Sequence, residues 1–211
     1  MLSKKPNKQE LRTKETRELL LRAAETIFVR DGYEKAELGE IATLAGRTKG
    51  AIYAQFKSKE DIFLALVEEK AQHNRNAVLE KLSTSTSIEQ NLATVRQFFL
   101  SISENQAWTL LLLEFKLYAI RHPESKERLQ KLYETINPTD REEMLIRVLG
   151  PTGKGKDTMS RTLAVQILQP LLSALAVEAK FAPDLLDEEA TKKIAGRVFD
   201  VLLPPNTTGA S

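Results

Sequence analysis

Residues 39–56 read GEIATLAGRTKGAIYAQF, and this stretch decides how the N-terminal part of the chain folds. A helix-turn-helix requires a small residue where its two helices cross and a glycine in the turn, because the backbones approach closely there. Ala42 and Gly46 meet these two requirements. The apolar residues expected to face inward are Ile41, Ala42, Ala45, Ile52 and Phe56. The stretch therefore predicts one helix over 38–45, a turn, and a second helix over 48–56.

The second helix of this pair has a free face that suits a DNA groove. Thr48 can cap its N-terminus and leave backbone N–H groups available to a phosphate or a base edge. Lys49 can donate to guanine or phosphate, and the small residues Gly50 and Ala51 let the helix enter a major groove deeply. The residues that we expect to contact DNA are Arg47, Thr48, Lys49, Gly50, Ala51, Tyr53, Gln55, Lys57 and Lys59.

Residues on both sides of the motif extend a pattern that resembles a known family. The segments LLLRAAETIFVRDGY at 19–33 and IATLAGRTKGAIYAQFKSKEDIF at 41–63 are similar to the DNA-binding domain of TetR/AcrR-type transcriptional regulators. The shared spacings are AAxxxFxxxGY, IAxxAG and TxGxxYxxF, and EFKLYAIRHPE at 114–124 is also common in such regulators. The resemblance implies a homodimeric repressor that a small apolar or amphipathic ligand releases from a palindromic operator.

Three positions depart from the family pattern. Ala36-Glu37 stand where relatives usually carry Thr or Ser, so the hydroxyl that makes a phosphate contact there is missing. Arg47 replaces an apolar residue, and it could reach DNA or lie along the surface. Gln55 replaces the commoner His and keeps a donor for phosphate. The departures leave the motif intact and affect single contacts only.

Simpler explanations exist for parts of this pattern. A chance pair of antiparallel helices would explain Ala42 and Gly46, although not the wider family spacing. A solvated helix start would explain Lys57 and Lys59 as well as a DNA contact does. An all-helical adaptor protein would explain the helices, but not Thr48 followed by Lys49 and Gly50.

Helical spacing continues through the rest of the chain, and no alternation of period two predicts a sheet. We expect an all-α fold with about nine helices, in three regions: an arm and DNA-binding domain at 1–57, a ligand-binding and dimerisation domain at 58–203, and a disordered tail at 204–211. The expected helices cover 11–30, 38–45, 48–56, 58–82, 88–102, 108–120, 124–149 with a break at Asn137-Pro138, 157–181 with a kink at Pro170, and 187–202.

The resemblance also implies sites in the C-terminal domain. The aromatic residues that could line a ligand cavity are Phe98, Trp108, Phe115 and Tyr118, and core packing is the alternative for each of them. The apolar residues that could form a four-helix dimer interface are Leu163, Ile167, Leu171, Leu175, Ile194 and Val198, and packing within the chain is their alternative.

Composition limits the remaining classes of function. The chain has no Cys, and His73 and His122 lie far apart without a carboxylate cluster at metal spacing, so no metal or cofactor is expected. No paired carboxylates, activated nucleophile or cofactor motif predicts an enzyme, and Gly153-Lys154-Gly155-Lys156 lacks the spacing of a phosphate loop. Residues 1–12 lack the apolar region of a signal peptide and no run of about 18 apolar residues exists, which favours a cytoplasmic protein with no membrane partner.

Charge is unevenly distributed along the chain. The net charge is +2, but residues 1–60 carry 13 Lys and Arg against 9 Asp and Glu, while the remainder carries 18 against 20. A basic N-terminal part is what binding to the phosphate backbone requires. The bias is small and gives modest support to double-stranded DNA as the partner.

Overall fold

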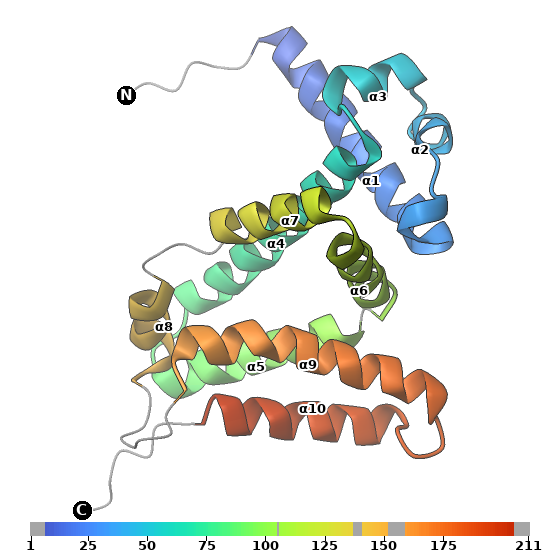
Figure 1. The fold of residues 1–211 in the computed structure, drawn as a ribbon. Helices are drawn as coiled ribbons and strands as arrows, with labels where there is room; N and C mark the ends of the chain where they lie inside the picture. The colour runs from blue at the N-terminus through green and yellow to red at the C-terminus, as the bar shows by residue number, and fades with distance from the viewer. Residues whose placement is uncertain (1–6, 105, 137–140, 152–158, 205–211) are drawn as a thin grey trace, which may run out of the picture. The chain divides into compact units, whose positions relative to one another are not determined.

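The computed structural model describes residues 7–104, 106–136, 141–151 and 159–204, and over these ranges its regular structure is entirely helical (Figure 1). The helices are α1 (Lys8–Lys35), α2 (Leu38–Leu44), α3 (Lys49–Gln55), α4 (Lys59–Ser83), α5 (Ile88–Glu104), α6 (Gln106–Arg121), α7 (Pro123–Ile136), α8 (Arg141–Leu149), α9 (Arg161–Phe181) and α10 (Glu188–Leu202). The all-α prediction is confirmed. The segment predicted at 124–149 forms two helices, while the expected break itself at Asn137-Pro138 lies outside the described residues.

The chain forms two compact units, and three helices contribute residues to both. The first unit contains the residues up to Gln72 together with Glu114–Tyr133, and the second contains His73–Leu113 and the residues from Glu134 onward. Helices α4, α6 and α7 each have residues in both units. The functional boundary expected between residues 57 and 58 stays a prediction.

Local capping signals account for several helix ends. Ser58 Oγ accepts a hydrogen bond from the Asp61 N–H at 3.1 Å, and the Asp61 carboxylate accepts one from the Lys57 N–H at 2.8 Å. These reciprocal bonds start α4 where the sequence predicted its start. Asp187 caps α10 through the Ala190 N–H at 2.7 Å, also as the predicted bounds require.

Gly32 interrupts α1 at the position where the sequence predicted its end. Its φ of 80° and ψ of 169° are non-helical, and such a conformation favours glycine. One short helical stretch follows, to Lys35. The predicted stop is therefore a kink that redirects the chain toward α2.

The second unit has its own hydrophobic core. Its buried residues come from α5, α8, α9, α10 and their ends, and they are Leu92, Val95, Phe99, Leu149, Ala164, Leu168, Leu172, Ala195, Phe199 and Leu203. Helix α9 begins at Arg161, later than expected, and continues through Pro170. By length and composition alone α9 could cross a membrane, but a core helix passes the same test, so the finding carries little weight.

Candidate nucleic-acid interface

The turn between α2 and α3 has the geometry that the sequence predicted. Gly46 adopts a φ of 64°, and its N–H donates to the Thr43 carbonyl at 3.0 Å. The Arg47 N–H donates to the Ala42 carbonyl at 2.8 Å. These two bonds form a Schellman motif, in which a glycine in the left-handed region ends the helix. The turn therefore fixes the direction in which α3 leaves α2.

The inner faces of α2 and α3 are buried in the first unit. Ile41 and Ile52 have no exposed surface, and Ala42, Ala45 and Phe56 are also buried. Helices α1, α2 and α3 all contact one another, as Figure 1 shows. The predicted three-helix arrangement of the helix-turn-helix is confirmed.

The outer face of α3 carries the predicted DNA-contacting side chains. The Thr48 hydroxyl accepts from the Ala51 N–H at 3.3 Å and caps the helix as predicted. Thr48, Lys49 and Gly50 are exposed, and the Tyr53 side chain is 59% exposed in a helix whose Ile52 is fully buried. Tyr53 therefore lies on the outer face of α3 with its ring in solvent.

Two further residues support α3, and sequence reasoning missed both. The end of the Lys49 side chain lies over Gly39 of α2, where a Cβ would lie 2.6 Å from Lys49 Cε, so a side chain at 39 would make the lysine move. The Thr16 hydroxyl of α1 accepts from Arg47 Nε at 3.4 Å, while Arg47 Nη1 donates to the Gly46 carbonyl at 3.2 Å. These contacts hold Arg47 between α1 and the turn, and whether it also contacts DNA stays a prediction.

The N-terminus of α2 reflects the departure from the family pattern at Ala36-Glu37. Glu37 occupies the N-cap position, but its side chain makes no capping hydrogen bond. Ala36 is buried. This helix start therefore presents no hydroxyl donor, as the sequence led us to expect.

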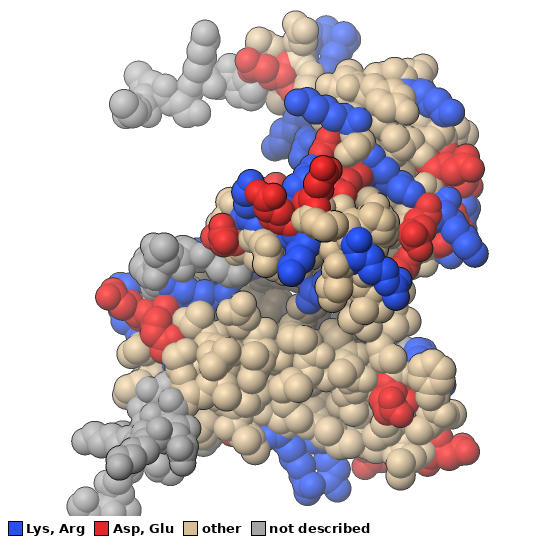
Figure 2. Space-filling view, in the orientation of Figure 1, with Lys and Arg blue, Asp and Glu red and all other residues tan. Residues whose placement is uncertain are grey.

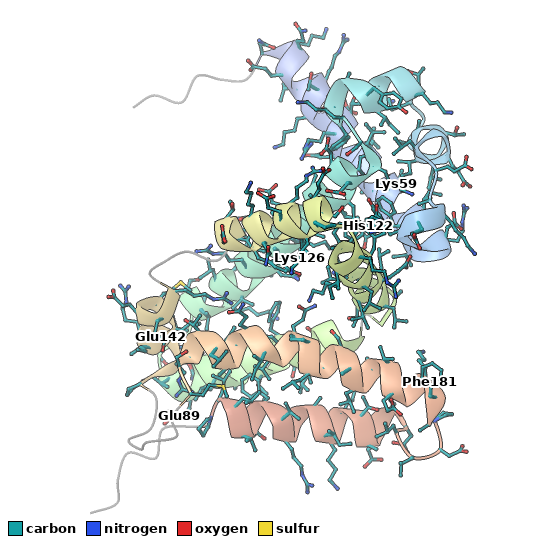
Figure 3. The ribbon with its side chains drawn as sticks, in the orientation of Figure 1. Lys59, Glu89, His122, Lys126, Glu142 and Phe181 are labelled. Atoms are coloured by element: carbon teal, nitrogen blue, oxygen red, sulfur yellow. The ribbon has the colours of Figure 1, made fainter. Side chains whose placement is uncertain are left out.

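Lys57 and Lys59 have different environments. Lys57 is exposed at the start of α4. Lys59, labelled in Figure 3, is half-buried and donates to the Glu34 carbonyl at 2.6 Å and to the Ala36 carbonyl at 3.2 Å. Burial lowers the pKa of the Lys59 ammonium, and the nearby carboxylate of Glu34 opposes this effect. A DNA contact by Lys59 stays untested, but its ammonium has protein partners.

The four aromatic candidates for a ligand site divide between the two units. Phe115 is fully buried and stacks on Phe63 with ring centroids 4.2 Å apart, in a cluster that also contains Tyr118. Phe98 packs against the core of the second unit, and Trp108 is half-buried there. A role of these residues in ligand binding stays a prediction.

The six dimerisation candidates lie on α9 and α10. Leu163, Leu171 and Ile194 are 48%, 46% and 37% exposed, whereas the other three are half-buried. Of those three, Leu175 and Val198 pack against the core of their own unit. In Figure 2 the visible surface over α9 and α10 is mostly uncharged. A dimer through this surface stays a prediction.

Within the ranges that the structure covers, no group of three or more His, Asp or Glu residues is placed to hold a metal ion.

Comparison with known proteins finds a family match at the N-terminal end of the chain. Residues 20–66, from α1 into the first turns of α4, match the family described as bacterial regulatory proteins, tetR family. Its N-terminal part is similar to this family. The chain is 36% identical over 101 residues to the HTH-type transcriptional activator FasR of Mycolicibacterium smegmatis, covering 47% of this chain and 46% of FasR. It is 49% identical over 53 residues to the repressor BepR of Brucella suis, covering 25% of each. The chain thus matches less than half the length of these relatives.

Solved structures with the same fold extend over nearly the whole chain. The transcriptional regulator FadR from Bacillus subtilis in complex with stearoyl-CoA has a TM-score of 0.62 at 18% identity, and it covers 90% of this chain and 98% of FadR. A SmeT–triclosan complex has a TM-score of 0.60 at 23% identity, covering 93% of this chain and 98% of SmeT. At such low identity these similarities establish the fold of this chain and nothing finer.

Proposed function

We propose that this protein regulates transcription by inserting α3 into the major groove of an operator. The observation that carries the proposal is the division of α3 into a buried face at Ile52 and an uncovered face at Thr48, Lys49, Gly50 and Tyr53. A short helix with small residues at its tip and one cation suits direct readout of base edges. The match of residues 20–66 to a family of bacterial regulatory proteins supports the same function.

Eight of the nine predicted contact residues enter this proposal as DNA contacts. Lys49 and Ala51 face base edges, and Tyr53, Gln55 and Lys57 bind the flanking phosphates. Arg47, Thr48 and Gly50 complete the tip of the helix. Lys59 is left out, because two carbonyl oxygens already accept from its ammonium.

The regulator acts as a homodimer on a palindromic operator. One α3 has only seven residues and buries little DNA surface, so two half-sites are needed for tight binding. Exposed leucines at 163 and 171, with Ile194 of α10, supply the apolar surface for the twofold contact. The operator half-sites are then expected one helical turn apart, or a multiple of it, on the duplex.

A small apolar or amphipathic ligand releases the repressor from its operator. Stearoyl-CoA and triclosan are the ligands named for two proteins of the same fold, and both contain large apolar parts. A near-complete switch requires the ligand to favour the DNA-free conformation by about 5.5 kcal/mol. Repression is the proposed direction, although FasR is named an activator and BepR a repressor. The protein acts in the cytoplasm and no enzymatic reaction is proposed for it.

Selection of genomic fragments by the full-length protein tests this function. Fragments retained at about 50 mM salt should converge on one palindromic sequence and be released as salt increases, because phosphate contacts displace bound cations. The Lys193→Ala variant, altered at an exposed lysine of α10, should select the same sequence. Retention of no duplex even at low salt would contradict the proposal.

A further inference from the structure

The segment between α1 and α2, residues 32–37, is held by side chains that lie far from it in sequence. This α1–α2 junction follows the kink at Gly32 and leads directly into the first helix of the helix-turn-helix. Its position therefore sets where α2 and α3 lie relative to α1. The contacts that hold it come from α4 and α6, within the first compact unit.

Glu114 of α6 binds the start of the junction. Its carboxylate oxygen Oε1 accepts a hydrogen bond from the Tyr33 N–H at 2.9 Å, across 81 positions of sequence. The same carboxylate fills the space where a side chain at Gly32 would begin, since a Cβ there would lie 2.8 Å from Oε1 and 2.9 Å from Oε2. Gly32 is thus favoured by its backbone conformation, and a side chain there would push the Glu114 carboxylate away from the Tyr33 N–H.

Lys59 of α4 binds the rest of the junction with the opposite polarity. Its ammonium donates to the carbonyl oxygens of Glu34 and Ala36, and it lies 5.0 Å from the centre of the Tyr33 ring. The Glu114 carboxylate therefore accepts a hydrogen bond from a backbone N–H of the junction, while the Lys59 ammonium donates hydrogen bonds to two of its backbone carbonyls. Such charge-assisted hydrogen bonds are stronger than neutral ones.

Aromatic packing fixes the same junction from the same two helices. The Tyr33 ring centre lies 4.7 Å from that of Phe115 and 4.9 Å from that of Tyr118, both on α6. It also lies 5.2 Å from the Phe63 ring on α4. The contacts with Phe115 and Phe63 are edge-to-face, which is favourable at these distances. The junction therefore has polar and apolar contacts with both helices.

The first turn of α4 is itself held in place, which fixes the direction of Lys59. Ser125 of α7 donates to Glu60 Oε2 at 2.5 Å, and Arg128 donates to Glu60 Oε1 at 2.7 Å. Arg128 also pairs with Asp61. Lys59 thus lies in a turn that α7 stabilises. A contact between its ammonium and a phosphate would require both hydrogen bonds to the Glu34 and Ala36 carbonyls to break.

We propose that Glu114 and Lys59 clamp the α1–α2 junction and act as positioning residues for the helix-turn-helix. This inference rests on the proposed DNA-binding function. It gives Lys59 a role different from the phosphate contact that its sequence position predicts. It also makes DNA affinity depend on a residue of α6, well outside the helix-turn-helix. Loss of the clamp frees the backbone of the junction in the unbound protein, and DNA binding must then order it again.

The salt dependence of DNA binding separates positioning residues from contact residues. The logarithm of the binding constant falls with the logarithm of salt concentration, with a slope of about −0.9 for each phosphate contact. A positioning residue changes the affinity at every salt concentration and leaves this slope unchanged. We expect Glu114→Ala and Lys59→Met to weaken binding to the selected operator about tenfold, the effect of ordering roughly one backbone residue.

Matched variants define the two alternatives. Lys57→Ala should reduce the magnitude of the slope by about 0.9 for each protomer on the duplex, because its lysine is a proposed phosphate contact. Glu114→Gln, which keeps an oxygen acceptor for the Tyr33 N–H, should bind within about threefold of the natural protein. A slope change in Lys59→Met equal to that in Lys57→Ala would overturn the clamp and establish a phosphate contact.

Hydrogen exchange in the DNA-free protein tests the clamp independently of any operator. Glu114→Ala should raise the exchange rate of the Tyr33 amide at least tenfold and leave amides of α9 unchanged, because only the junction loses a bond. An unchanged exchange rate at Tyr33 in Glu114→Ala would overturn the clamp. Faster exchange throughout Glu114→Ala, with the same increase in Glu114→Gln, would also overturn it, because the effect would then be global destabilisation. Failure of the natural protein to bind DNA would contradict the proposed function, while the exchange rates would still decide the clamp.

Discussion

Glu142 and Arg161 cap each other's helices. The Glu142 carboxylate, in the first turn of α8, accepts from the Arg161 N–H at 2.9 Å and from the Thr162 N–H at 2.7 Å, at the start of α9. The Arg161 guanidinium in turn donates to carbonyl oxygens at the end of α8, with Gly150 at 3.2 Å and Pro151 at 3.0 Å. Two helices of the second unit are thus joined by reciprocal bonds between charged side chains and helix ends.

Arg161→Met should destabilise the second unit. The Arg161 side chain is only 2% exposed, and methionine of similar volume would leave its carbonyl partners without donors. Stranding buried carbonyl groups costs about 1–3 kcal/mol, which corresponds to a decrease in Tm of about 2–12 °C for a chain of this size. Thermal unfolding followed by circular dichroism measures the change. A Tm equal to that of the natural protein would show that the guanidinium bonds contribute nothing net.

Acidic pH should weaken the hydrogen bonds between Glu142 and the start of α9. Burial would raise the pKa of Glu142, but its hydrogen bonds with Thr162 and Arg161 outweigh burial and lower it. The stability that Glu142 contributes is therefore present above the ordinary carboxyl range and is lost as pH falls through the lowered pKa. Denaturant unfolding of the natural protein should lose more free energy between about pH 6 and pH 3 than that of Glu142→Gln. Parallel pH profiles for the two proteins would contradict this assignment.

Two glycines with positive φ should respond differently to alanine. Gly46→Ala adds a Cβ that meets no atom within 4 Å, so it should cost only the backbone strain of about 1–2 kcal/mol. Gly32→Ala places its Cβ against the Glu114 carboxylate and should cost clearly more. Free energies of unfolding from urea titrations compare the two variants. The Glu114→Ala change should recover part of the Gly32→Ala loss, and strictly additive effects would count against the close approach.

These elements also show what the sequence could and could not reveal. The helix-turn-helix depends on Ala42, Gly46 and Thr48, whose bonds run to neighbours within five positions, so local pattern was sufficient to predict it. The contact of Glu114 with Tyr33 depends on the folded path of α6, which no local pattern encodes. A phosphate contact was predicted for Lys59 from its place next to the motif. Its bond to the Glu34 carbonyl could not be predicted, because that bond depends on the path of the chain after the kink at Gly32.

The approximate positions of the C-terminal helices were predictable from periodicity, whereas the assignment of their faces was not. The bounds of α10 follow from Asp187 and the apolar spacing after it. The same spacing cannot separate a residue that packs inside its own unit, such as Leu175, from one left exposed, such as Leu171. Both residues lie on the same apolar face of the helix, so only tertiary packing determines which of them is covered.

Charge placed on the exposed face of α9 should disrupt the proposed dimer. Leu163→Lys combined with Leu171→Lys puts two cations where the twofold contact would bury leucine side chains, and desolvating them is unfavourable. Sedimentation equilibrium should give a dimer mass for the natural protein and a monomer mass for this variant. Ile120→Lys, altered at a 68% exposed apolar residue of α6, is the control and should remain dimeric. A dimer that survives the double change would place the interface elsewhere.

The effect of Lys49→Ala on base preference tests the central claim most directly. Binding of the full-length natural protein and of this variant is measured on the selected operator and on duplexes with single base-pair changes under the tip of α3. If α3 reads the major groove, the natural protein should lose about 1–3 kcal/mol at a guanine contacted by Lys49, and the variant should no longer distinguish that position. Equal discrimination by both proteins at every position would contradict the placement of α3 in the groove.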